Sequence, residues 1–168
     1  MSKPIGIELA ELVELNINEA LDFETGFGNP FSLDFSLMFG VDVNEVREDC
    51  WATDLTLIGA ESDLYDLLEQ GIQTSSIWNT IALVTTGWAS PLGENGEVEC
   101  PPSQHKDKRR LRMVLIGDLL DFGVSSCLRF QDNGEILSVG ADEASGLLAE
   151  AFQAFMKTTA HHNQVKMN

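Results

Sequence analysis

The residues best suited to chemistry in this chain are bases gathered in one short stretch. They lie within residues 106–112, directly after His105, and five of the ten bases of the chain are found there. Guanidinium groups present forked donors that match phosphate and carboxylate oxygens, and a neighbouring imidazole can act as an acid, a base or a further donor. The stretch is therefore a candidate site for an anionic ligand. Its bases are Lys106, Lys108, Arg109, Arg110 and Arg112.

A β-strand over 109–117 would position these bases, because alternate side chains of a strand point to opposite faces. Lys108, Arg110 and Arg112 then share one face, and Leu111, Met113 and Leu115 share the other. We expect His105, Lys108, Arg110, Arg112 and Trp88 to be the ligand-binding residues. The competing interpretation is that the bases pair with the protein's own acids in weak surface ion pairs.

A long connection precedes the basic stretch. The 19 residues from Ser90 to Lys108 join two expected strands, and a connection of this length in a compact domain is typical of a functional or flexible loop. Trp88 stands where the first of these strands enters the loop. It could form one wall of a pocket beside His105, or close the core at the edge of the sheet.

Other familiar chemistries lack their motifs. Cys100 and His105 are separated by five positions without the second close ligand pair of a zinc site, so no metal or cofactor is expected. The segment 123–127 contains no G-x-S-x-G elbow, and 26–31 lacks the third glycine of a dinucleotide fingerprint. No catalytic residue is assigned, and whether the chain is an enzyme stays open.

Charge is distributed very unevenly along the chain. Residues 1–105 hold 19 acids and two bases, whereas 106–168 hold eight of each, so the first part carries the whole formal charge of -17. Such an acidic surface repels nucleic-acid phosphates and attracts basic proteins, although net charge also serves solubility alone. Direct nucleic-acid binding is not expected. Three cysteines in no disulfide framework, and no apolar run of membrane-spanning length, favour a cytoplasmic protein without a membrane segment.

Hydrophobic periodicity predicts the elements that carry these residues. Helical spacing is seen over 5–21 and from Asp142 to Phe155, and short helices are expected over 42–49 and from a cap at Ser62 or Asp63 to Gly71. Strands are expected over 54–58, 77–89, 109–117, 122–131 and 135–139, with a hairpin at Asp132-Asn133-Gly134.

The segment 30–39 supports two interpretations. Its phenylalanines alternate with polar residues as in a strand, but Asn29, Pro30 and Gly40 are also placed as the cap, first residue and end of a helix. The alternation slightly favours a strand. The aromatic side chains fill the core or form an interface with a partner, and the interface candidates are Phe31, Phe35 and Phe39.

Together these patterns predict an α+β fold. We expect an antiparallel β-meander of three to five strands packed against amphipathic helices as a single layer sandwich, with one domain over 1–158 and a flexible tail over 159–168. The first functional hypothesis is a small acidic, non-enzymatic interaction or regulatory protein that docks on a basic protein partner, in the extreme as a partial mimic of nucleic-acid charge. The alternatives are a module that binds a phosphate- or carboxylate-bearing ligand near 90–112, and a subunit of a larger assembly, including a homo-oligomer.

Overall fold

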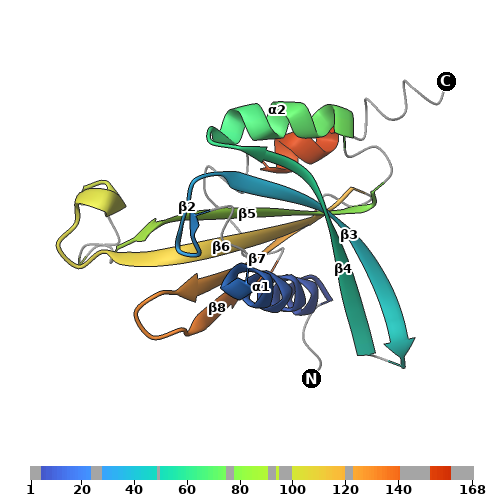
Figure 1. The fold of residues 1–168 in the computed structure, drawn as a ribbon, viewed down its shortest axis with the longest axis horizontal. Helices are drawn as coiled ribbons and strands as arrows, with labels where there is room; N and C mark the ends of the chain where they lie inside the picture. Colours follow the sequence, from blue (N-terminus) through green and yellow to red (C-terminus); the bar gives the residue numbers. More distant parts are fainter. Residues whose placement is uncertain are drawn as a thin grey trace.

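The computed structural model describes residues 5–23, 28–48, 50–74, 78–90, 94, 100–119, 123–140 and 152–159. Within these residues the centre of the fold is a six-stranded antiparallel sheet with the order β4-β3-β5-β6-β7-β8 (Figure 1). Its strands are β3 (Ser36–Arg47), β4 (Cys50–Glu61), β5 (Thr80–Ala89), β6 (Arg109–Asp118), β7 (Val124–Phe130) and β8 (Ile136–Val139).

Helices cover both faces of this sheet. The helix α1 (Ile5–Phe23) lies on one face, and α2 (Leu64–Thr74) lies on the other together with the helical residues 152–159 (Figure 1). The expected α+β class with an antiparallel sheet is confirmed. The sheet has six strands instead of the expected three to five. It is the middle layer between two helical layers.

Strand alternation builds two separate cores. In β5, Ala82 and Val84 face α1 and form part of what we call the α1-side core. Ile81 and Leu83 face the other way and join the α2-side core with Leu67 and Phe152. A strand covered on both faces reads as a continuous apolar run, and for this reason 81–84 shows no polar alternation.

The short helix expected over 42–49 is wrong, because residues 42–47 form the outer half of β3 and Glu48 lies in the turn after it. Val41 and Val43 alternate with Asp42 and Asn44, which is a strand pattern that the apparent helix cap obscured. Pairing with β4 then fixes the extended backbone, with Val43 opposite Thr53. The strand expected over 54–58 is correspondingly longer, from Cys50 to Glu61.

The ambiguous segment 30–39 is not helical. It contains the two-residue strand β2 (Ser32–Leu33), which pairs with β1 (Gly28–Asn29), and the start of β3. The strand alternative is therefore correct, with a bend at Asp34 and Phe35 that the alternation did not indicate.

Most of the other expected elements are confirmed. The strands β5 to β8 and the helix α1 lie where the patterns placed them. The expected hairpin joins β7 to β8, where the Gly134 N–H donates to the Phe130 carbonyl at 2.9 Å and Gly134 adopts a φ of 71°. Such a positive φ favours glycine. The expected start of a helix at Asp142 and most of the expected tail lie outside the described residues, but Thr159 is still helical.

A short 3₁₀ helix, η1 (Pro102–Gln104), is the described structure within the long connection from Ser90 to Lys108. It follows Pro101, and the Gln104 N–H donates to the Pro101 carbonyl at 2.9 Å. This turn leads directly into the basic stretch. Among the described helices, none has the length and apolar character needed to span a membrane.

The cap of α2 is Asp63 rather than Ser62. Its Oδ1 accepts hydrogen bonds from the backbone N–H groups of Tyr65 at 2.9 Å and Asp66 at 3.1 Å. Substituting Asp63→Ala should therefore lower the free energy of unfolding by about 1 kcal/mol in urea denaturation, the usual cost of losing an N-cap. Ser62→Ala, next to it on the exposed surface, should change it by less than about 0.5 kcal/mol. Equal effects of the two substitutions would contradict this assignment.

Candidate functional site

The cations predicted to share one face of a strand do so. Arg110 and Arg112 lie on one face of β6, and Lys108, just before the strand, contacts the same Trp88 ring as Arg110. We call Lys108, Arg110 and Arg112 the cation row; Leu115 on the opposite face belongs to the α2-side core. Their surroundings differ strongly, however. Arg112 is fully buried, Arg110 is half-buried and Lys108 is exposed, so the row runs from the interior to solvent.

The buried end of the row is an arginine–glutamate–arginine cluster. Glu14 of α1, 1% exposed, accepts a hydrogen bond from Arg112 Nη2 at 2.7 Å on Oε1. Arg129 of β7 donates from Nε to Oε1 at 2.6 Å and from Nη2 to Oε2 at 2.5 Å. Arg112 and Arg129 are direct partners in the β6–β7 register, which explains why one carboxylate meets both. Arg112 therefore lies beneath α1 and not on an accessible surface.

Electrostatics in this cluster favour the charged forms. Burial raises the pKa of Glu14, but hydrogen bonds from Arg129 and Arg112 and their positive charges outweigh it and leave the pKa below its usual value of 4.5. The hydrogen bond to Glu14 likewise raises the pKa of Arg129. One carboxylate against two guanidinium groups leaves these three side chains with a net positive charge, and the neutral Asn18 side chain accepts a further hydrogen bond from Arg112 at 2.8 Å.

The middle of the row fastens the segment between α1 and β3 onto the sheet. Arg110 donates from Nε to the carbonyl of Phe31, and Arg112 donates from Nη1 to the carbonyl of Pro30 at 3.2 Å. The Phe31 ring lies 4.9 Å from the Arg112 guanidinium carbon. Arg110 also donates to Thr86 Oγ1 at 3.3 Å. These contacts give two of the predicted ligand-binding residues an internal role.

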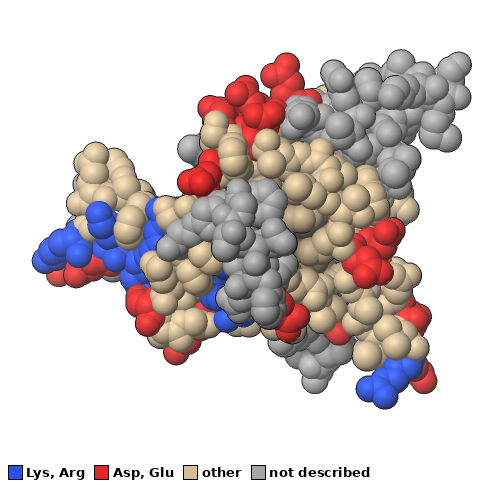
Figure 2. Space-filling model, in the orientation of Figure 1, with Lys and Arg blue, Asp and Glu red and all other residues tan. Residues whose placement is uncertain are grey.

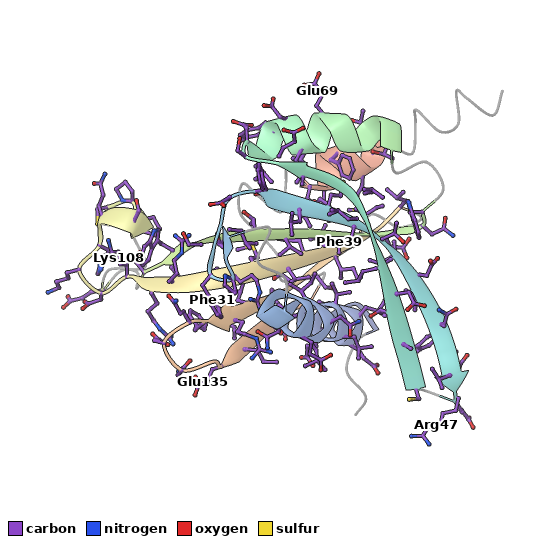
Figure 3. All side chains as sticks on the ribbon, in the orientation of Figure 1. Phe31, Phe39, Arg47, Glu69, Lys108 and Glu135 are labelled. Carbon is purple, nitrogen blue, oxygen red and sulfur yellow. The ribbon has the colours of Figure 1, made fainter. Side chains whose placement is uncertain are left out.

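The exposed end of the row surrounds a tryptophan. Trp88 is 38% exposed and stands directly opposite Arg110 in the β5–β6 register. Lys108 Nζ lies 4.6 Å from the centroid of its ring, and the Arg110 guanidinium carbon lies 4.9 Å from it. Such cation–π contacts are stronger where the cation is partly desolvated. Trp88 therefore does not close the core, and it stands with two cations at the end of the sheet where Figure 3 labels Lys108.

His105 serves the turn before β6. It is 8% exposed, its Nδ1 accepts a hydrogen bond from the Asp107 N–H at 2.9 Å, and its carbonyl accepts one from the Lys108 N–H at 3.3 Å. The imidazole shapes the chain that presents Lys108. The structure thus brings together Trp88, Lys108 and Arg110 at the surface, while His105 and Arg112 lie inside.

Arg109 belongs to the other face of the strand. Its guanidinium lies 3.9 Å from the centroid of the Phe130 ring and forms two hydrogen bonds of 2.7 Å with the Asp132 carboxylate. The hydrogen bond raises the pKa of Arg109 and lowers that of Asp132. Arg109 therefore forms an ion pair with one of the protein's own acids, as the competing interpretation of the basic stretch predicted.

The predicted interface phenylalanines do not form one surface. Phe35 is 39% exposed at the bend before β3, whereas Phe39 packs against the α1-side core and Phe31 lies half-buried beside Arg112 (Figure 3). Two of the three residues therefore have internal contacts, and Phe35 is the most exposed of the three.

The buried thiol of Cys127 is a poor candidate nucleophile. Burial raises the pKa of the Cys127 thiol to about 11, so this group is a thiol and not a nucleophilic thiolate near neutral pH. Among the residues that the structure describes, no three His, Cys, Asp or Glu side chains gather as a metal-binding group.

Exposed acids instead gather on α2. The cap Asp63 and the helix residues Asp66 and Glu69 are exposed, and Tyr65 between them is 70% exposed. Acidic atoms cover this part of the molecule, whereas basic atoms gather at the far end of β5 and β6 (Figure 2). We call Asp63, Tyr65, Asp66 and Glu69 the acidic helix face.

Sequence reasoning missed the partner of Arg112. Glu14 falls within the buried stripe of α1, between Val13 and Ile17 and four positions after Ala10. An acid inside an apolar stripe is the signal that could have identified it, because a carboxylate is rarely buried without a cationic partner. Comparison with protein-family models, curated proteins and solved structures found no match to this chain.

Proposed function

We propose that this protein is a non-enzymatic interaction protein that docks on a basic protein partner through the acidic helix face. The observation that carries the proposal is the setting of Tyr65. Its side chain is 70% exposed and is flanked by exposed carboxylates at Asp63, Asp66 and Glu69. Within the described part of the chain, none of these carboxylates forms an ion pair.

The physical chemistry of this face suits a basic surface. A formal charge of -17 on the chain steers a cationic partner toward it and speeds association, and the carboxylates then select against acidic partners. A tyrosine adds contact area with few rotatable bonds and can receive a lysine or arginine on its ring. Leu67 and Leu68 are buried in the α2-side core and hold the helix against the sheet.

Charge reversal on the helix provides the test. We expect a basic protein to be captured stoichiometrically from a lysate at low salt, and its affinity to fall about tenfold or more when Asp66→Lys and Glu69→Lys are combined. The matched control combines Asp42→Lys and Asp54→Lys, two exposed acids that face each other across β3 and β4. This pair changes the net charge by the same amount but lies away from the acidic helix face.

A third variant separates contact from charge. Tyr65→Ala should weaken the complex by about tenfold without changing how its affinity depends on salt, because it removes an aromatic contact and no charge. Circular dichroism of each variant verifies that the fold is retained. The proposal fails if the control pair weakens binding as much as the helix pair, if affinity is independent of salt, or if no basic protein is captured.

A further inference from the structure

The exposed end of the cation row is a second surface, of opposite charge. We define the Trp88 shelf as Trp88, Lys106, Lys108 and Arg110, at the end of β5 and β6 that extends beyond the helices (Figure 1). Basic atoms gather at this end in Figure 2, while the acidic helix face lies over α2. The shelf is distinct from the surface on which the proposed function rests.

Two of the three cations of the shelf, Lys108 and Arg110, are held in place before any partner arrives. Arg110 is fixed by the Phe31 carbonyl and by Thr86 Oγ1, and Lys108 Nζ donates to the Ser103 carbonyl at 2.9 Å. Both also contact the Trp88 ring. Prior fixation lowers the side-chain entropy that binding must remove, so each contact gains more affinity.

These cations keep donors for a partner. Arg110 uses Nε and Nη2 but forms no hydrogen bond through Nη1 in the structure described, and Lys108 uses one of its three ammonium hydrogens. In the same described residues, no carboxylate pairs with Lys106, Lys108 or Arg110, in contrast to Arg109 with its Asp132. Among the described residues, these cations therefore leave positive charge for an anionic partner to pair with.

The shape of the shelf favours several anions held side by side. Lys106 and Lys108 are exposed and Trp88 is 38% exposed, so a single small anion would stay in contact with water and salt. Several linked carboxylates gain from one another because the second contact forms intramolecularly. A nucleic acid carries a longer array of charge, which the field of this strongly acidic chain repels.

We propose that the Trp88 shelf binds an acidic segment of a partner protein, in which several Asp or Glu side chains contact Lys106, Lys108 and Arg110 in turn. Trp88 supports this contact by holding the two nearer cations against its ring. The shelf thus gives the protein a second binding surface, which accepts the charge that the acidic helix face rejects.

Fluorescence anisotropy with a labelled oligo-glutamate peptide tests the proposal. The wild-type protein should bind this peptide at low salt and release it as salt is raised. Lys108→Glu and Lys106→Glu should each weaken binding about tenfold. The matched control is Arg47→Glu, which reverses an exposed base at the distant tip of β3 (Figure 3), and it should change the affinity by less than about twofold.

Trp88→Leu examines the role of the ring. It should weaken peptide binding several-fold because Lys108 and Arg110 lose their common support, while thermal unfolding shows that the fold remains. The proposal is overturned if the wild-type protein does not bind the peptide, if Arg47→Glu weakens binding as much as Lys108→Glu, or if a labelled single-stranded DNA binds more tightly than the peptide. None of these results bears on docking through the acidic helix face, because that docking is tested by the substitutions at Asp66 and Glu69.

Discussion

The substitution Glu14→Gln should lower the free energy of unfolding by about 3–5 kcal/mol, measured by urea denaturation at neutral pH. Glutamine keeps the size of the side chain but removes the charge, so two guanidinium groups are left beneath α1 without their anion. Arg112 suffers most, since its side chain is fully buried and its Nε already lacks a hydrogen-bond partner in the described structure. Arg129 is partly relieved because 19% of its side chain reaches solvent.

The effect of this substitution should depend on pH in a defined direction. The pKa of Glu14 is lower in the folded protein than its usual value of 4.5. The stability that the charged carboxylate contributes is therefore fully present above the unfolded-state pKa, and it is lost as the pH falls through the folded-state pKa. The difference in stability between wild type and Glu14→Gln should be constant near neutral pH and should shrink in acid.

A double-mutant cycle isolates the ion pair itself. Arg112→Met alone should be destabilising, but combined with Glu14→Gln it should cost less than the sum of the two by at least about 1 kcal/mol. Glu19→Gln, an exposed acid on the same helix, serves as the control and should change the stability by less than about 0.5 kcal/mol. Additive effects in the cycle, or a difference that does not shrink in acid, would show that the three charges are not coupled.

The same cluster marks where sequence reasoning succeeded and where it stopped. Alternation along β6 correctly placed Arg110 and Arg112 on one face, and Lys108, just before the strand, contacts the same Trp88 ring as Arg110. It could not indicate how far along that face the helix α1 extends, because this depends on packing between residues 98 positions apart. As a result, the pattern predicted one exposed row of cations, whereas the structure has a row that is buried at one end.

The strands show the same division between local and tertiary information. β5 to β8 were predictable because each has β-branched or aliphatic runs bounded by turn residues, and Asp132-Asn133-Gly134 specifies a hairpin. The outer half of β3 was not, because Asp42 and Asn44 also resemble a helix cap. Pairing of this half with β4 favours the strand over the helix. Local residue propensities do not predict this pairing, because it depends on tertiary contacts.

Gly40 occupies a position in β3 where the structure leaves no room for a side chain. A Cβ built on it would lie 2.2 Å from two carbons of the Trp78 ring and 2.7 Å from a third. The ring packs against the α2-side core and is rigid, so it cannot bend away as a long side chain would. Gly40→Ala should therefore lower the free energy of unfolding by about 1–3 kcal/mol, and a larger residue should cost more.

Gly87 in the neighbouring strand β5 provides the matched control for this prediction. A Cβ built there meets no heavy atom within 4 Å, so Gly87→Ala should stabilise the protein by about 0.5–1 kcal/mol through the lower backbone entropy of alanine in the unfolded chain. In urea denaturation the two glycine substitutions should thus have opposite signs. Combining Gly40→Ala with Trp78→Leu, which removes the ring, should cost less than the sum of the two single effects. If Gly40→Ala proved as stable as Gly87→Ala, the Trp78 ring would not lie over β3, and this part of the α2-side core would need a different packing.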